Sequence, residues 1–227
     1  MKDELIVYNR PKSNISEDIR TIRTNLQFTS SEDESQSFLV TSSIPGEGKS
    51  FISSNLAVAF AQTGASTIIV DSDLRLGRVH KIFNVSNSKG LSNLLVGNNI
   101  NKLDSYIKET KIPNLYVISR GMVPPNPSEL LNSNNARKLI DTLKDNFDYV
   151  IFDGVPINGL PDSLILAGLL DRVVLVASAN YTNIDDLNDT KKALEKIDAK
   201  IAGVVLNKAS QNKRGKYGKY SNYYYYK

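Results

Sequence analysis

Six short apolar runs follow one another from Phe38 onward, and segments with helical character separate them. The runs cover residues 38–41, 67–71, 115–119, 149–153, 172–177 and 201–207. They are mostly continuous rather than alternating in polarity, which is typical of strands buried on both faces of a parallel sheet. Helices are predicted between them at 50–62, 91–96, 127–131, 136–146, 161–169 and 184–196. This alternation predicts a doubly wound, mostly parallel α/β sheet whose strands end at a common ligand-binding edge.

The first 36 residues are mainly polar and precede this pattern. Apolar residues recur at helical spacing from Ile15 to Leu26, which predicts an amphipathic helix that Asn14 or Ser16 caps and that ends near residue 28. An acidic, serine-rich connector is expected at 30–37. A second face of the helix carries charges at three-residue spacing, at Glu17, Arg20 and Arg23.

Composition limits the function classes. The 227 residues include 41% hydrophobic residues, which suits one sizeable α/β domain. There are no cysteines, which excludes disulfides, cysteine zinc sites and thiol catalysis. His80 is the single histidine, which argues against a histidine triad or metal cluster. No run approaches the roughly 18 apolar residues of a membrane-spanning helix, so we expect a cytoplasmic protein.

The segment 38–50 combines an apolar strand, a glycine-rich turn and the start of a helix. A turn of small residues lets several backbone N–H groups point at one anion, and the helix N-terminus adds partial positive charge. Lys49 would reach the β- and γ-phosphates of a nucleotide, and the Ser50 hydroxyl would bind Mg²⁺. Ser43 stands where the P-loop consensus begins with glycine. The ATP contacts predicted in this segment are Pro45, Gly46, Glu47, Gly48, Lys49, Ser50 and Phe51.

Carboxylates follow two of the predicted strands. Asp71 ends one strand and Asp73 lies two residues on, while Asp153 ends another. Such carboxylates can hold Mg²⁺ and accept a proton from a hydroxyl nucleophile. The plain alternative is a set of solvated strand ends, and the neighbouring phosphate loop favours the functional interpretation. We predict Lys49, Asp71 and Asp73 as catalytic residues and Ser50, Asp71 and Asp153 as the Mg²⁺ site.

Asn207 ends the last predicted strand. Its amide offers a donor and an acceptor together, so it could bind an adenine edge. Because Asn also commonly begins turns, the alternative is that Asn207 is an ordinary residue at the end of a strand, with no contact to a nucleotide.

The last segment, 209–227, has no aliphatic residue beyond Ala209 and is predicted to be a flexible tail. It holds five Lys or Arg and no acid, and six of the eleven tyrosines. It could bind single-stranded nucleic acid, be a solvated terminus, or accept phosphoryl groups, which would invert its charge. The tyrosines are Tyr217, Tyr220, Tyr223, Tyr224, Tyr225 and Tyr226.

Taken together, these motifs resemble the bacterial tyrosine kinases (BY-kinases), in particular the cytoplasmic branch of capsule or exopolysaccharide synthesis. The matches are the Walker A segment 42–50, a second Walker-type segment 68–75, Walker B at 150–153, a block at 121–131, the charged helical motif and the tyrosine tail. The family usually has Thr-Pro-Pro after the Walker B aspartate, where this chain has Gly154, Val155 and Pro156.

The resemblance implies an ATP- and Mg²⁺-dependent protein-tyrosine kinase with a P-loop fold of the MinD/ParA-like type. Asp71 would be the base toward a tyrosine hydroxyl, with Asp73 supporting it. The tail tyrosines would be phosphorylated in trans within a homo-oligomeric ring, an octamer in relatives, assembled through Glu17, Arg20 and Arg23. The resemblance also divides the chain into an oligomerisation helix and connector (1–36), a kinase domain (37–208) and a phosphoacceptor tail (209–227).

The implied partners are a membrane activator of the polysaccharide co-polymerase type and a cognate phosphotyrosine phosphatase, with no nucleic acid. The activator would hold the protein at the inner face of the cell membrane. The alternative is a non-kinase MinD/ParA-like ATPase that dimerises with ATP. Those ATPases commonly carry a second lysine early in the Walker A segment, where this chain has Ser42 and Ser43. They also often end in an amphipathic helix rather than in tyrosines.

Overall fold

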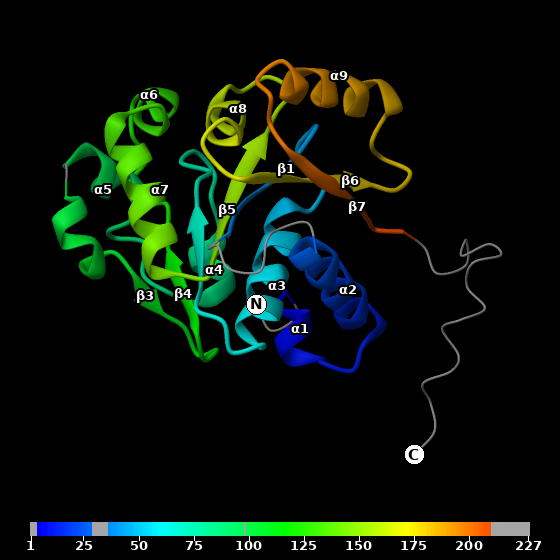
Figure 1. Cartoon of the computed structure of the whole chain (residues 1–227), viewed down its shortest axis with the longest axis horizontal. Helices are drawn as coiled ribbons and strands as arrows, with labels where there is room; N and C mark the ends of the chain where they lie inside the picture. Colours follow the sequence, from blue (N-terminus) through cyan, green and yellow to red (C-terminus); the bar gives the residue numbers. More distant parts are fainter. Residues whose placement is uncertain (1–3, 29–35, 98, 210–227) are drawn as a thin grey trace.

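The computed structural model describes residues 4–28, 36–97 and 99–209. The predicted phosphoacceptor tyrosines and most of the predicted connector lie outside these residues. Within them, a seven-stranded sheet has the order β3-β4-β2-β5-β1-β6-β7. Every adjacent pair is parallel except β3 and β4, which are antiparallel. The prediction of a doubly wound, mostly parallel sheet is confirmed (Figure 1).

The strands agree closely with the apolar runs but several are longer. They are β1 (Gln36–Ser42), β2 (Thr67–Asp71), β3 (Lys108–Glu109), β4 (Leu115–Ile118), β5 (Tyr149–Pro156), β6 (Arg172–Ser178) and β7 (Ile201–Asn207). Gln36 and Ser37 belong to β1 rather than to the connector, because both are buried beside β5. The short strand β3 was not predicted, since it has two residues and neither is apolar.

The helices, in chain order, are α1 (Ile6–Asn9), α2 (Asn14–Phe28), α3 (Lys49–Ala61), α4 (Val79–Phe83), α5 (Leu91–Val96), the 3-10 helix η1 (Ile100–Ser105), α6 (Pro127–Leu131), α7 (Asn134–Asn146), α8 (Asp162–Ala167) and α9 (Ile184–Glu195). The Ser13 hydroxyl accepts a hydrogen bond from the Ser16 N–H at 3.2 Å, so neither predicted residue caps α2. Ser16 is instead buried, and its hydroxyl donates to the Arg10 carbonyl at 2.7 Å.

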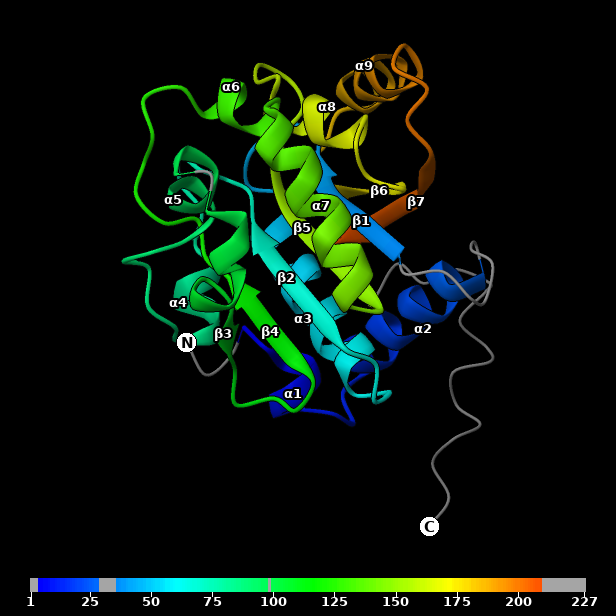
Figure 2. The same cartoon turned by 60° about the vertical axis from the view of Figure 1, so that its left-hand side comes forward.

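Apolar side chains of successive strand residues point to opposite faces of the sheet and form two cores. Helices α1 to α4 cover one face, where Phe38, Ile69 and Ile151 pack. Helices α5 to α9 cover the other face, where Leu39 and Phe152 pack. Figure 2 shows α7 lying across the strands on this second face. Burial on both faces explains why these strands appear in the sequence as continuous apolar runs.

Within the part of the chain that the structure describes, no helix combines the length and the apolar character needed to cross a membrane.

Candidate active site

The glycine-rich turn after β1 leads directly into α3, which begins at Lys49. Gly46 and Gly48 have φ angles of +82° and +100°, which side-chain-bearing residues rarely adopt. A Cβ on Gly48 would lie only 2.1 Å from Asn207 Nδ2. The sequence therefore places glycine where the backbone must turn sharply and approach β7 closely. This strand-turn-helix geometry is that of a phosphate-binding loop.

The end of β7 braces this loop. Asn207 Nδ2 donates a hydrogen bond to the Glu47 carbonyl at 2.8 Å, and Lys208 Nζ donates to the Gly46 carbonyl at 2.7 Å. Asn207 is thus beside the loop, as a nucleotide-contacting residue must be. Its amide nitrogen binds the backbone here, and the adenine contact stays a prediction.

Glu47 is fully buried, with its side chain directed away from solvent. Its carboxylate accepts hydrogen bonds from the Ile44 N–H at 2.9 Å and from the Thr182 hydroxyl. The Thr182 oxygen in turn accepts one from the Ser178 N–H at 2.6 Å. Glu47 therefore fixes the turn from inside, and its contribution to nucleotide binding would come from its backbone. The role of Thr182 was missed, because 135 residues separate it from Glu47.

Lys49 lies among the predicted carboxylates. Burial lowers the pKa of Lys49, and the charges of Asp153, Asp73 and Glu47 oppose that shift. The structure thus brings the predicted phosphate-binding cation and two of the predicted acidic residues into one electrostatic site.

Asp71 and Asp153 lie side by side, in register on the adjacent parallel strands β2 and β5. Asp71 ends β2, and β5 continues beyond Asp153 to Pro156. Asp71 Oδ2 accepts a hydrogen bond from the Val79 N–H at 3.1 Å, and its Oδ1 is buried without a partner. Burial, together with the nearby charge of Asp153, raises the pKa of Asp71 well above its ordinary range. A carboxylate with a raised pKa takes up a proton more readily, as a general base must.

Asp153 is almost fully buried. Its Oδ1 accepts a hydrogen bond from the Ser53 hydroxyl at 3.0 Å, and its Oδ2 is buried without a partner. Burial raises the pKa of Asp153 to about 6, although the Ser50 hydroxyl and the charge of Lys49 oppose the shift. Ser53, one turn into α3, was not predicted, since nothing local distinguishes it from other helical serines.

This group of oxygens fits Mg²⁺. The unpartnered oxygens of Asp71 and Asp153 and the nearby Ser50 hydroxyl are the hard ligands that Mg²⁺ prefers. In residues 4–28, 36–97 and 99–209, no three His, Cys, Asp or Glu side chains are arranged around one metal position. Mg²⁺ usually binds through one or two carboxylates together with substrate phosphates, so two are enough.

Asp73 lies in the loop between β2 and α4. Its Oδ1 accepts hydrogen bonds from the N–H groups of Arg75 and Leu76 at 3.1 and 2.8 Å. Arg75 forms an ion pair with the buried Asp162 of α8 at 3.1 Å. Arg75 ends the second Walker-type segment, whereas Asp162 was not predicted as a site residue.

The segment after Asp153 differs from the family pattern, and the structure gives a steric reason. A Cβ at Gly154 would lie 2.7 Å from Ser163 Oγ and 2.8 Å from Leu39 Cδ1. The Ser163 hydroxyl donates to the Val155 carbonyl at 2.6 Å, and β5 continues to Pro156. In this chain, α8 occupies the space beside Gly154 that a larger residue would need.

The three charged residues of α2 have partners within the chain. Arg20 forms an ion pair with Glu17 at 2.5 Å, and Arg23 Nη1 donates to the Ala59 carbonyl of α3 at 3.2 Å. The Glu17 side chain is 64% exposed and so remains accessible to a neighbouring subunit. Their role in assembly stays a prediction.

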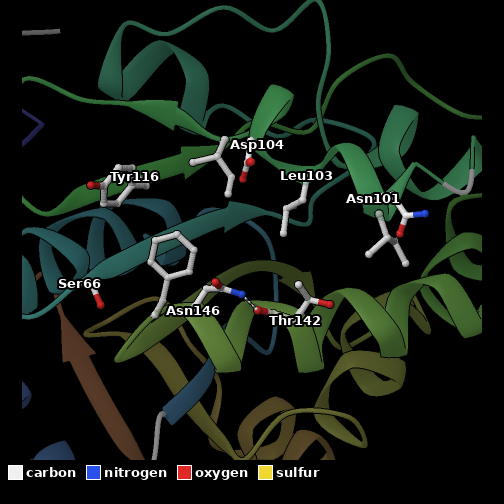
Figure 3. Close-up of a pocket in the computed structure, with 10 residues that line it drawn as sticks. Ser66, Asn101, Leu103, Asp104, Tyr116, Thr142 and Asn146 are labelled. Atoms are coloured by element: carbon white, nitrogen blue, oxygen red, sulfur yellow. Dashed lines mark hydrogen bonds between the residues drawn. The ribbon is translucent and has the colours of Figure 1, made fainter.

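A separate pocket of about 480 Å³ lies between η1, β4 and α7 (Figure 3). Tyr116 and Phe147 line it, with ring centroids 5.5 Å apart. None of the predicted site residues lines this pocket.

The fold and the loop geometry define the class: this is a P-loop nucleotide-binding protein. A family model described as an AAA domain matches residues 40–206. Among solved structures, the cell division ATPase MinD of Pyrococcus furiosus has a TM-score of 0.64 at 25% identity, covering 75% of this chain and 71% of MinD.

Several relatives match over most of the chain. Tyrosine-protein kinase YwqD of Bacillus subtilis (strain 168) is 37% identical over 220 residues, which cover 97% of this chain and 92% of YwqD. The crystal structure of the chimerical protein CapA2B2 has a TM-score of 0.86 at 42% identity and covers 92% of this chain and 91% of the chimera. The chain therefore belongs to the bacterial tyrosine kinase family, as the sequence motifs predicted.

Proposed function

We propose that this chain is an ATP-dependent protein-tyrosine kinase that phosphorylates its own tyrosine-rich tail in trans. The observation that carries the proposal is the convergence of the phosphate loop with Asp71 and Asp153. These two residues lie side by side on the adjacent strands β2 and β5, and each has a buried carboxylate oxygen without a partner. Membership of the tyrosine kinase family supports the choice of reaction.

In the proposed reaction, backbone N–H groups of residues 45–51 and the Lys49 ammonium hold the ATP phosphates. Asp71 takes the proton of the acceptor tyrosine. The phenolic oxygen then bonds to the γ-phosphorus as the bond to the β,γ-bridging oxygen breaks, which gives phosphotyrosine and ADP. Asp73 supports Asp71. When bound at Ser50, Asp71 and Asp153, Mg²⁺ would neutralise charge on the phosphate oxygens.

The proposed acceptors are Tyr217, Tyr220, Tyr223, Tyr224, Tyr225 and Tyr226, which lie outside the described residues. Assembly into a ring through α2 would place one subunit's tail near a neighbour's site at high effective concentration. Each phosphorylation adds about −1.5 to −2 charges, so a modified tail would be repelled by the acidic edge of the site. The kinase would then alternate between an assembled unmodified state and a dissociated modified state.

We propose a role in the synthesis and export of capsular or extracellular polysaccharide, at the inner face of the membrane. A membrane activator would recruit the kinase there, and a phosphotyrosine phosphatase would reset the tail. One of the solved structures that match this chain is a chimera, named CapA2B2, which supports a partner protein.

The competing proposal, a MinD/ParA-like ATPase without kinase activity, shares the fold. Ser42 and Ser43 stand where those ATPases commonly carry a further lysine. The kinase relative YwqD is 37% identical over 97% of this chain, which favours the kinase.

A mixing experiment tests transfer between subunits. A Lys49→Met protein with an intact tail is incubated with ATP, Mg²⁺ and an active protein whose six tail tyrosines are phenylalanine. Phosphate is expected on the tail of the Lys49→Met partner, since only that tail can accept it. If that tail stays unmodified while wild-type protein labels itself, transfer occurs within one chain and the trans proposal is wrong.

A further inference from the structure

The Asp162 carboxylate is buried at the start of α8 and binds Arg75 with both oxygens. Its Oδ2 accepts a hydrogen bond from Arg75 Nε at 3.1 Å, and its Oδ1 accepts one from Arg75 Nη2 at 3.4 Å. The Ser128 hydroxyl of α6 donates to the same Oδ1 at 2.5 Å. Asp162 is 1% exposed, so its charge is compensated by these partners rather than by water.

Arg75 lies within the loop 72–78, which joins β2 to α4 and carries Asp73. Its N–H donates to Asp73 Oδ1 at 3.1 Å. Its carbonyl accepts a hydrogen bond from Arg120 Nη1 at 2.5 Å. With the ion pair to Asp162, these contacts tie the middle of the loop to helix α8 and to Arg120, which follows β4.

The same loop shapes the surroundings of Asp71. Gly77 lies so close that a Cβ there would come within 2.1 Å of Asp71 Oδ1. The N–H of Val79, just after the loop, donates to Asp71 Oδ2 at 3.1 Å. A shift of the loop would therefore change the contacts of Asp71 as well as those of Asp73.

Helix α8 also contacts the strand that carries Asp153. The Ser163 hydroxyl donates to the Val155 carbonyl at 2.6 Å, two residues beyond Asp153. The first two residues of α8 thus contact the loop that follows β2, through Asp162, and strand β5, through Ser163.

We propose that Asp162 is a positioning residue for phosphoryl transfer, which acts through Arg75 to hold the loop 72–78 and thereby align Asp71 and Asp73 with Asp153. The inference rests on the proposed kinase function. Removing the Asp162 charge leaves Arg75 without its partner and frees the loop, and a misplacement of about 1 Å can reduce a rate on the order of 10²-fold.

Amide hydrogen exchange tests the positioning without relying on activity. In Asp162→Asn, the amides of Arg75 and Val79 should exchange about tenfold faster or more than in wild type, because the loop opens more often. Asp171→Asn is the matched control. This substitution disrupts the ion pair between Asp171 and Lys144, whose charged atoms are 2.7 Å apart. The Asp171 carboxylate also accepts a hydrogen bond from the Ser37 N–H, at the end of β1 that lies away from the phosphate loop. Asp171→Asn should leave the exchange of both amides unchanged.

Steady-state kinetics test the link to catalysis. Asp162→Asn should lower kcat by about tenfold to a hundredfold and leave KM for ATP within about threefold, since no phosphate-loop contact involves Asp162. Asp171→Asn should leave kcat unchanged. Combining Asp162→Asn with Arg75→Ala should lower kcat no further than the worse single variant, because both break one contact. If Asp162→Asn does not fold, Arg75→Lys takes its place in the test. It removes the two-point contact from the Arg75 side of the ion pair, where the side chain is 37% exposed rather than buried.

Unchanged exchange at Arg75 and Val79, or single-variant losses that multiply in the double variant, would overturn the proposal. A kcat loss in Asp171→Asn equal to that in Asp162→Asn would also overturn it, since the effect would then be general destabilisation. If wild-type protein forms no phosphotyrosine, the proposed function fails, while the exchange result still decides whether Asp162 positions the loop.

Discussion

The buried charge of Asp153 has a consequence for folding that can be measured without any substrate. Burial raises the pKa of this carboxyl from 3.8 to about 6. The folded protein therefore keeps the Asp153 proton to a higher pH than the unfolded chain does. Stability is greatest while the group is protonated and falls as pH rises through the folded pKa.

The size of the loss follows from the shift. About two pKa units at 1.36 kcal/mol each give about 3 kcal/mol of destabilisation above about pH 6. Asp153→Asn removes the titrating charge and keeps the shape of the side chain. It also removes a charge that helps raise the pKa of Asp71, which acts in the same direction. The variant should therefore be more stable than wild type by about 3 kcal/mol near neutral pH, with most of the gain lost near pH 4.

Urea denaturation followed by far-UV circular dichroism measures this difference across the pH range, with EDTA present to remove Mg²⁺. The chain has no tryptophan, which makes fluorescence a poorer probe. Adding ATP and Mg²⁺ should then stabilise wild type more than the variant, because binding to the folded state adds to its stability. A wild-type advantage at neutral pH, or a difference that does not change with pH, would refute the buried-charge account.

Two further predictions concern the same site, and a third concerns the charged face of α2. Asp71→Asn should lower tyrosine phosphorylation on the order of 10²-fold or more without unfolding the protein. A normal rate with normal Mg²⁺ dependence would show that the Asp71 carboxylate has no catalytic role. Gly48→Ala should weaken ATP binding in calorimetry, because its Cβ would lie 2.1 Å from Asn207 Nδ2, whereas Gly159→Ala, also at positive φ but in open space, should not. Replacing the three charged residues of α2 with alanine should give monomers in light scattering, and an unchanged assembly would exclude the motif as the interface.

The sequence predicted those parts of the site that are local in the chain. Strand, glycine turn and helix are contiguous around Lys49, so the phosphate loop could be identified directly. Asp71 and Asp153 were placed at one edge because continuous apolar runs indicate parallel strands, whose carboxyl ends meet there. The register that sets these two carboxylates side by side needed the structure.

Contacts between distant segments could not be predicted. The partners Arg75 and Asp162 are 87 residues apart, and nothing in the Walker-type segment that ends at Arg75 indicates which acid it binds. Glu47 likewise gives no sign in the sequence that its side chain is buried. The extension of β5 through Gly154 to Pro156 was missed because glycine and proline usually end strands.

Phosphotyrosine mapping by mass spectrometry tests the central claim most directly. Purified wild-type and Lys49→Met proteins are incubated with ATP and Mg²⁺, with and without a peptide from a candidate membrane activator. We expect phosphotyrosine on the tail tyrosines of the wild-type protein and none on the Lys49→Met variant, which loses the cation that would hold the ATP phosphates. ATP hydrolysis without phosphotyrosine in wild type, or undiminished phosphotyrosine in Lys49→Met, would contradict it.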